Sequence, residues 1–450
     1  MIPQRFSGLQ LAMLAGAVLV AAPLRAQSPT SDDGARPVSL SEAITLAQRN
    51  SPAVVQARGL DRNSNAARKQ ARGAFIPNLN ITASSGYTQG TTINSFTGQL
   101  QSLSGNPWSY GNGLGLNLEL FDGGRRFSEL NRVRAVANVA DITAIAAQFD
   151  ASLQVKQQFY AALAARESEA AARSQLEQAQ QQLKASSARV SAGVATKSDS
   201  LRSAIQVGNA QLAVLTSQND LRVANAALTR VAGSTVTITA SPSDTMDTQL
   251  TLPTDVELEP LVNEGPAVRL AESNVSVARA VKRSQKSTYL PTLNMSYNYA
   301  FNQNSGGFAG GNLFLVGGGN PNRQTLNFNF SYPVFNGFTR EANAVQLDVA
   351  LTNAEAQLRD ARLAARQNLT SFLRSVQNAQ ARVQVQLAAI AAAEEDLRVQ
   401  QQRYALGAST LLDLLTSQTQ LTQARQALIQ ARLDGRIARA QLSSLIGREL

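Results

Sequence analysis

The sequence contains no cysteine and no histidine, and only 5% of its residues are aromatic. Without cysteine and histidine the chain cannot build an ordinary zinc site, a thiol nucleophile, a disulfide scaffold or a histidine-based catalytic triad. An enzyme would have to rely on carboxylates, lysine, serine or tyrosine, and no pair of acids stands on a plausible pocket. The sequence therefore predicts a protein that is not an enzyme and that uses neither a cofactor nor a metal.

Long apolar runs are also scarce. One runs from Leu9 to Leu24, after the positive charge of Arg5, and a polar stretch begins after Ala26. This order is typical of an export signal, so we predict a signal peptide over residues 1–26. No other window offers 18 continuous apolar residues, which excludes a helical membrane protein. The absence of cysteine also excludes a lipidated amino terminus, and a periplasmic, secreted or outer-membrane protein is left.

The charge balance is basic, with 41 lysines and arginines against 31 acidic residues. These basic residues are spread along the chain among glutamine and alanine rather than among aromatic side chains that could stack on bases. Such a distribution is typical of solvated helix faces. The sequence therefore predicts no binding to nucleic acid.

The chain contains an internal two-fold repeat with an offset of 214 residues. Six pairs of positions carry the same residue at this offset: Pro52 and Pro266, Pro77 and Pro291, Phe121 and Phe335, Gly193 and Gly407, Asp199 and Asp413, and Gly233 and Gly447. Six coincidences at one spacing indicate a duplicated unit. We predict a first repeat over 38–236, a spacer over 237–251 and a second repeat over 252–450.

Each repeat has two segments in which apolar and uncharged polar residues alternate, which predicts strands at about 77–89, 112–121, 291–302 and 324–334. The strands are about ten residues long and have aromatic residues toward their ends, which favours membrane-spanning barrel strands with one face toward lipid. A half-buried sheet in a soluble sandwich alternates in the same way and is the alternative. Four strands cannot close a barrel, so several chains would have to contribute to one.

The rest of each repeat is helical. A helix precedes the first strand of each repeat, from Pro52 to about Phe75 and over 264–288. Long helices are predicted over 124–192 and 338–406, and shorter helices return over 196–233 and 410–447. Each long helix would measure about 100 Å, which exceeds any globular core. In the second long helix the apolar positions recur every 3.6 residues rather than every 3.5, which favours a straight tube of helices over a rod-like coiled coil.

In combination, these features resemble the TolC-like outer-membrane efflux protein family, also called outer-membrane factors. The resemblance spans the whole mature chain and depends on three features: the two-fold repeat, the prolines Pro77 and Pro291 after the ascending helices, and paired turns of two kinds. Strand-to-helix turns stand at Phe121–Gly123 and Phe335–Gly337, and Arg-x-x-x-Gly-x-x-x-x-x-Asp turns at Arg189–Asp199 and Arg403–Asp413.

The resemblance implies a mainly α-helical homotrimer, in which a 12-stranded β-barrel in outer-membrane lipid continues as a 12-helix periplasmic α-barrel. The spacer would lie in the equatorial region of that tube. Such a trimer is the exit duct of a tripartite export system. It passively conducts drugs, metals or other substrates delivered by an inner-membrane pump and a periplasmic adaptor. A type I protein secretion duct shares the architecture and is an alternative, and a trimeric coiled-coil adhesin is a second one.

The turns between the long and the returning helices admit two readings. Gly193 and Gly407 suit left-handed helix caps, and Asp199 and Asp413 stand in the first turn of a helix, where a carboxylate is stabilising. The resemblance implies instead that these turns form the adaptor-docking tip and the gate. The residues implicated are Arg189, Gly193, Asp199, Arg403, Tyr404, Gly407 and Asp413.

Single positions at the tip follow or depart from the family pattern. Asp413 matches the first acidic gate position, whereas Thr416 stands where some members carry a second acid. Tyr404 and Asp199 match a pair that bonds across helices, whereas Ser409 occupies a position that can be arginine.

Overall fold

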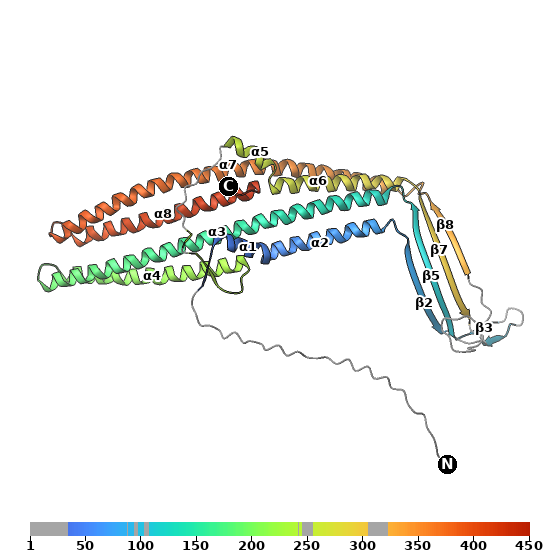
Figure 1. Cartoon of the computed structure of the whole chain (residues 1–450), viewed down its shortest axis with the longest axis horizontal. Coiled ribbons are helices and arrows are strands. Elements are labelled where there is room, and N and C mark those ends of the chain that lie inside the picture. The colour runs from blue at the N-terminus through green and yellow to red at the C-terminus, as the bar shows by residue number, and fades with distance from the viewer. Residues whose placement is uncertain are drawn as a thin grey trace, which may run out of the picture. The chain divides into compact units, whose positions relative to one another are not determined.

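The computed structural model describes residues 35–87, 89–93, 98–102, 108–241, 243–244, 255–304 and 323–450, and residues 36–450 form one compact unit. The signal peptide predicted over 1–26 lies outside the described residues. Helices dominate this unit, and Figure 1 shows them running side by side next to one sheet.

Two helical hairpins form the larger part of the described residues. The long helices α3 (Arg125–Ser191) and α7 (Thr339–Ala405) have 67 residues each, and the returning helices α4 (Lys197–Ala232) and α8 (Leu411–Ile446) have 36 each. α3 packs against α4, α7 packs against α8, and α3 also contacts α8, which joins the two hairpins. Within the described ranges, no helix combines the length and the hydropathy needed to cross a membrane.

Shorter helices pack beside the long ones. α1 (Leu40–Asn50) contacts α3 and α4, and α2 (Pro52–Gly73) packs on α3. α5 (Asp255–Asn263) packs on α7 and α8, and α6 (Pro266–Ser284) lies between α3 and α7.

The segment predicted as one helix over 264–288 begins later and ends earlier than expected. Gly265 is the N-cap of α6, and Pro266 occupies its first turn, where a missing backbone N–H costs nothing. A 3₁₀ helix, η1 (Gln285–Tyr289), follows α6. Leu290 then adopts extended backbone because it precedes Pro291, whose ring disfavours a helical conformation before it.

One antiparallel sheet contains strands of both repeats, in the order β2 (Asn78–Tyr87), β5 (Trp108–Phe121), β7 (Thr292–Asn304) and β8 (Arg323–Ser331). The central pair, β5 and β7, joins the repeats and sets Leu116 opposite Tyr297. All four strands connect to helices at the same end of the helical layer (Figure 1).

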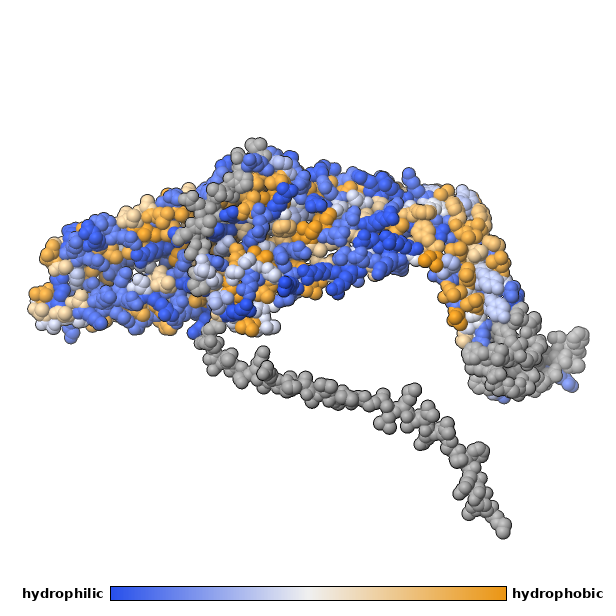
Figure 2. Space-filling model, in the orientation of Figure 1, coloured by the Kyte–Doolittle hydropathy of each residue, from blue (hydrophilic) through white to orange (hydrophobic). Residues whose placement is uncertain are grey.

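The sheet carries large apolar side chains that no other part of the described chain covers. On the edge strand β8, Leu326, Phe328 and Phe330 are 54%, 60% and 66% exposed, and on the edge strand β2, Ile81 is 83% exposed. Figure 2 shows hydrophobic residues gathered over the strands. A soluble sheet would bury such a face, because each large apolar side chain contributes about 1.5–3 kcal/mol when it leaves water.

Two pairs of three-residue strands were not predicted. β1 (Arg36–Val38) pairs in parallel with β6 (Ile238–Ala240), which lies inside the predicted spacer, and β3 (Thr91–Ile93) pairs with β4 (Leu100–Ser102). Three residues are too few to display a period of two, so pattern analysis passes over them.

The cores are thin layers between neighbouring helices. The first contains Val38, Val155, Phe159, Leu228 and Ile238, and it joins α3, α4 and the β1–β6 pair. A second core joins α5, α6, α7 and α8, and a third lies between α7 and α8 near their connecting turn. Many buried positions of α3 are alanine, which lets neighbouring helices approach closely.

Candidate functional site at the helical tip and the strand–helix turns

The two helical hairpins end in turns built the same way. Gly193 (φ +76°) and Gly407 (φ +73°) adopt the left-handed conformation that ends a helix, and side chains other than glycine rarely do so. The backbone N–H of Val194 donates to the carbonyl oxygen of Arg189 at 3.0 Å, and Ala408 donates to Arg403 at 2.8 Å. These bonds satisfy carbonyl groups that the helix leaves without partners.

Each returning helix begins with a capping box. The hydroxyl oxygens of Thr196 and Thr410 accept from the backbone N–H of Asp199 and Asp413 at 3.3 and 3.2 Å. In return, each carboxylate accepts from the backbone N–H and the hydroxyl of its own threonine. The structure thus gives both aspartates a local stabilising role in starting a helix.

The Asp413 carboxylate is the more heavily hydrogen-bonded of the two. It also accepts from the hydroxyl of Ser409 at 3.2 Å. Hydrogen bonds from Thr410, with that from Ser409, lower the pKa of Asp413 below its ordinary value of 3.8. Asp413 is therefore ionised at neutral pH and presents a negative charge at the exposed tip.

Arg189 connects the two hairpins. Its Nη1 donates to the carbonyl oxygen of Tyr404 at 2.6 Å, and its Cζ lies 4.7 Å from the centroid of the Tyr404 ring. The bond reaches the last turn of α7, where carbonyl groups lack helical partners and a positive charge favours the helix dipole.

Two polar atoms at this junction are buried without a hydrogen-bond partner: Arg189 Nε and Tyr404 Oη. Burial raises the pKa of Tyr404, the nearby charge of Arg189 opposes the rise, and that of Asp199 adds to it. Asp199 thus lies near Tyr404, yet the hydroxyl and the carboxylate of this family-matched pair are not hydrogen-bonded to each other within the described protein.

The remaining tip residues bond locally. Arg403 Nη2 donates to the carbonyl oxygen of Ala408 at 3.3 Å, so this side chain stabilises the turn in which it lies. The Thr416 hydroxyl donates to the carbonyl oxygen of Leu412 within α8, and the Ser409 hydroxyl shares its single proton between Asp413 and Oε1 of Gln400 on α7, at 3.2 and 2.9 Å. No group of three or more acidic side chains in the described ranges is placed to hold a metal ion.

The first strand-to-helix turn has a buried acid, Asp122, between Phe121 and Gly123, the two residues of this turn that were predicted as site residues. The Asp122 carboxylate accepts from the backbone N–H groups of Gly124 and Arg126 at 3.0 and 2.8 Å and from Arg126 Nε at 2.9 Å. Burial raises the pKa of Asp122, but the hydrogen bonds from Arg126 outweigh it and leave the pKa below its ordinary value. Asp122 therefore caps α3 as a carboxylate.

Gly123 is required because the second repeat approaches it closely. A Cβ atom at this position would lie 2.7 Å from the Cβ atom of Leu290 and 2.8 Å from the carbonyl oxygen of Ser287. Its equivalent, Gly337, has the same φ of +65° but no atom within 4 Å of such a Cβ. The surface that covers Gly123 thus has no counterpart over Gly337 in the described part of one chain.

The second turn, Phe335–Gly337, departs from the first at its centre. Asn336 replaces the acid, and Asn336 Oδ1 and Arg340 Nε are both buried without a partner. Phe338 stands where the first repeat has Gly124 and adopts a left-handed φ of +62°. Its ring packs edge-on against Phe335, with centroids 5.4 Å apart, and both side chains are exposed.

The prolines Pro77 and Pro291 stand directly before β2 and β7, where each ends the preceding helical segment. Beside each of them an arginine of the strand–helix turn lies over an aromatic ring. Arg126 Cζ is 5.2 Å from the Phe75 ring, and Arg340 Cζ is 4.9 Å from the Tyr289 ring. These four residues were not predicted as site residues, although both pairs obey the 214-residue offset that would have revealed them.

The profile of the family described as "Outer membrane efflux protein" matches residues 43–234 and 260–448, which is most of the chain and includes both tip turns and both strand–helix turns. The chain belongs to the outer membrane efflux protein family. This is a family of efflux channels and not of enzymes.

Individual members are more distant in sequence. The outer membrane protein TolC of Salmonella enteritidis is 24% identical over 170 residues, which is 38% of this chain and only 35% of that protein. The CmeC outer membrane channel of Campylobacter jejuni has a TM-score of 0.77 at 14% identity and covers 91% of this chain and 85% of its own. The MtrE outer membrane channel of Neisseria gonorrhoeae, solved in an open state, has a TM-score of 0.73 at 20% identity and covers 100% and 98%. These structures show that the efflux protein fold extends over the chain.

Proposed function

We propose that this protein is the outer-membrane exit duct of a tripartite export system. It conducts substrates passively from a periplasmic adaptor and an inner-membrane pump to the exterior. The observation that carries the proposal is the uncovered apolar sheet, joined to long helical hairpins, in a member of the outer membrane efflux protein family. Lipid is the environment in which such a sheet face is stable.

The repeat supplies a physical reason for assembly. β2 corresponds to β7 and β5 to β8, so the β5–β7 pairing inside one chain has an equivalent between β8 of one copy and β2 of the next. Applied to the Leu116–Tyr297 register, the offset places Phe330 opposite Ala83 of the neighbouring copy. In the same way, Gly73 and Ile76 of the neighbour would cover Gly337, as Ser287 and Leu290 cover Gly123.

In a closed ring of copies every strand pairs with a neighbour on both edges. No backbone N–H or C=O group of the strands is then left without a hydrogen-bond partner in lipid. Three copies give twelve strands. Each copy would also supply four helical segments of full length: α3, α7, α2 placed end to end with α4, and α6 placed end to end with α8. Three copies therefore give twelve such segments. We therefore infer a homotrimeric 12-stranded β-barrel continued by a 12-helix periplasmic α-barrel. Each copy contributes the repeats 38–236 and 252–450 after removal of a signal peptide, with the spacer 237–251 in the equatorial region.

The tip turns are the proposed gate and adaptor-docking surface. They combine the ionised Asp413 with exposed apolar side chains at Val194, Leu406 and Leu412, which are 65%, 84% and 60% exposed. Exposed apolar groups around a charged turn fit a protein partner. The Arg189 contact holds the two hairpins of each copy together where a gate would have to open.

The decisive experiment is reconstitution of the purified full-length protein in planar lipid bilayers. We expect a trimer in the outer-membrane fraction that produces ion conductance. A monomer, or a trimer without conductance, would contradict the duct.

The proposed register between β8 of one copy and β2 of the next is tested separately by cysteine crosslinking. The chain has no cysteine of its own that could form other crosslinks. Directly opposed residues in antiparallel strands are close enough for a disulfide. Phe330→Cys with Ala83→Cys should crosslink copies into covalent trimers. Phe330→Cys with Ile81→Cys, shifted by two residues on the same strand, should crosslink much less; equal yields would refute the register.

A further inference from the structure

Basic residues cluster at the ends of the two helices that lead into the sheet. α2 leads into β2, and α6 leads through η1 into β7, so both helices end beside the strands (Figure 1). At the offset of 214 residues, each basic position near the end of α2 corresponds to a basic position in α6 or η1. The pairs are Arg68 and Lys282, Lys69 and Arg283, and Arg72 and Lys286. We call these two sets of residues the junction clusters.

The repeats keep the positive charge at these positions although they differ around them. Lysine and arginine are exchanged within all three pairs, so the side chain changes while its charge stays. In the preceding positions, 58–67 and 272–281, no charge is shared between the repeats: Arg58 corresponds to Glu272, and Asp61 to Val275. A requirement for positive charge, rather than for one particular side chain, explains this difference.

Most of the charge in the junction clusters is not neutralised by the protein. Arg68 donates to the neutral amide oxygen of Asn65, and Lys282 forms an exposed ion pair with Asp348. The other four side chains are exposed and form no ion pair or side-chain hydrogen bond with any other residue in the described ranges. These four are Lys69, Arg72, Arg283 and Lys286.

The helix dipole accounts for only part of each cluster. A positive charge is favourable in the last turn of a helix, where Arg72 and Arg283 lie. Lys69 stands before the last turn of α2, where the effect of the dipole has fallen off. A second source of stabilisation is therefore needed for the charge of Lys69.

Assembly into a trimer would leave the clusters uncovered. α6 packs against both α3 and α7, and Arg283 and Lys286 are exposed even between these two neighbours. In the proposed trimer, α2 lies between α3 of its own copy and α7 of the next copy, which is the equivalent position. Lys69 and Arg72 would therefore stay exposed as well.

Exposed aromatic side chains mark the level at which the sheet begins. Phe127 in the first turn of α3, and Phe335 and Phe338 before α7, are 65%, 71% and 69% exposed. The Phe127 ring packs edge-on against Phe75, which follows Arg72 by three residues, with ring centroids 5.0 Å apart. Figure 2 shows the change from hydrophilic helices to hydrophobic strands at this level. Aromatic residues gather at the boundary between lipid and water, where the head groups lie.

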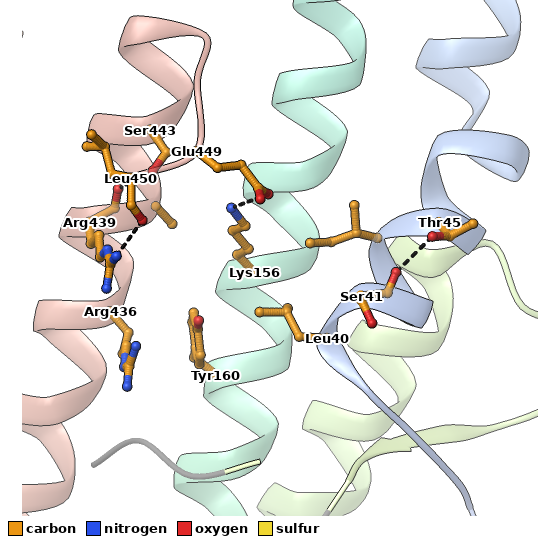
Figure 3. A pocket seen from close by; sticks show the side chains of 12 residues that line it. Leu40, Ser41, Thr45, Lys156, Tyr160, Arg436, Arg439, Ser443, Glu449 and Leu450 are labelled. Carbon is orange, nitrogen blue, oxygen red and sulfur yellow. Dashed lines mark hydrogen bonds and ion pairs between the residues drawn. The ribbon is translucent and has the colours of Figure 1, made fainter. Parts of the chain in front are cut away.

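The basic side chains around the largest internal cavity described here are different, because their partners are inside the protein. This cavity of about 440 Å³ between α1, α3 and α8 is lined by, among others, Lys156, Arg436 and Arg439 (Figure 3). Lys156 pairs with Glu449 at 3.3 Å, and Arg439 donates to the backbone oxygen of Leu450. Arg436 lies over the Tyr160 ring, with Cζ 5.8 Å from its centroid. The junction clusters, by contrast, direct their charge outside the protein.

We propose that the junction clusters bind the head groups of net-negative phospholipids at the membrane surface next to the helices. The long side chains of Lys69, Arg72, Arg283 and Lys286 can extend toward the phosphates while their helices remain in water. The clusters are continuous with the apolar sheet face, so one lipid molecule meets both surfaces. This proposal rests on the proposed exit duct, because only that function places the sheet in lipid.

The test uses the full-length protein reconstituted in phosphatidylcholine vesicles with a trace of spin-labelled lipid. Electron spin resonance measures the fraction of spin-labelled phosphatidylglycerol that the protein immobilises and, in a parallel sample, that of spin-labelled phosphatidylcholine. We expect phosphatidylglycerol to be preferred by about 3- to 10-fold at low salt. The preference should shrink in about 0.5 M sodium chloride, because salt screens exposed charges.

Two fourfold variants with the same change of charge locate the preference. Replacing Lys69, Arg72, Arg283 and Lys286 by glutamine should reduce the preference to about 1- to 2-fold. The control replaces two lysines and two arginines on α3 and α4, all exposed, by glutamine and should keep the preference. The control positions are Lys184, Lys197, Arg202 and Arg222.

Ion conductance, measured on the same preparations, separates this proposal from the exit duct. Protein that conducts but shows no preference, or equal preference in the two fourfold variants, overturns the lipid site and leaves the duct standing. A junction variant that keeps the preference but changes the anion selectivity of the conductance would place the charges in the channel, and also overturns the lipid site. Protein that immobilises neither lipid contradicts both proposals.

Discussion

Arg189 and Tyr404 are 215 positions apart in the sequence, yet the guanidinium of one bonds the backbone of the other and lies over its ring. Because Arg189 lies in the last turn of α3 and Tyr404 in the last turn of α7, this contact joins the tips of both hairpins within one chain.

Loss of the Arg189 contact should loosen the tip. Arg189→Gln removes a charge-assisted hydrogen bond and a cation–π contact, each of which contributes about 1 kcal/mol or more. We expect a higher open probability in planar bilayers without adaptor. Arg202→Gln, an exposed arginine on α4, is the control. An open probability that rises equally in both variants, or in neither, would show that the contact does not hold the gate.

A comparison of variants at Asp413 and Asp199 separates a gating role from a helix-capping role, because both aspartates form the same capping box. Alanine at either position removes a cap and should cost stability similarly. Only Asp413→Ala should reduce the block of conductance by divalent cations. If Asp199→Ala and Asp413→Ala alter cation sensitivity alike, or if neither does, Asp413 is a helix cap and not a gate residue.

The pKa of Asp413 sets the pH range in which divalent cations should block the conductance. Its folded-state pKa is lowered, so the carboxylate is charged at every pH above its ordinary pKa of 3.8 and loses its charge only below that value. Cation block in the unsubstituted protein should therefore persist from pH 7 to about pH 5.

The tip glycines should be needed for their conformation rather than for space. No atom lies within 4 Å of a Cβ built on Gly193 or Gly407, but both have a left-handed φ. Gly193→Ala or Gly407→Ala should lower the melting temperature, with a cost of about 1–2 kcal/mol. Gly208→Ala, equally uncrowded but inside α4, should raise it, because alanine favours helix by about 0.5–1 kcal/mol. Circular dichroism in detergent checks all three, and a lower melting temperature in the Gly208 variant would refute the explanation.

The unequal strand–helix turns predict a stabilising substitution. Asn336→Asp would give Arg340 Nε the carboxylate that Arg126 has in Asp122, and should add about 1 kcal/mol. The reverse change, Asp122→Asn, should cost about 1.5–3 kcal/mol. Unchanged melting temperatures for both would show that the two turns do not depend on this charge.

This stabilisation depends on pH with a definite sign. The folded-state pKa of Asp122 is lowered, so its contribution is complete above about pH 4 and is lost as pH falls through the folded value. The difference in melting temperature between Asp122→Asn and the unsubstituted protein should therefore stay constant from pH 7 to about pH 5 and shrink as the pH falls below about 4.

Much of the fold follows from local pattern, and some of it does not. Period-two alternation indicated the strands that became β2, β5, β7 and β8, because a strand exposed differently on its two faces must alternate. The three-residue strands β1, β3, β4 and β6 were missed because they are too short to show any period. At the tip, glycine and aspartate spacing indicated the caps, whereas the partners of Arg189 and Asp122 were not predicted.

The sequence by itself determined the duplication, the lengths of the two long helices and the family, since each depends on repeated or periodic residues. Only the tertiary structure decided that Arg189 meets Tyr404, that Leu290 covers Gly123, and that Arg436 and Arg439 share a cavity with Lys156. These contacts join residues more than 150 positions apart. They depend on how helices and strands are placed against each other, and a local pattern of side chains carries no record of that placement.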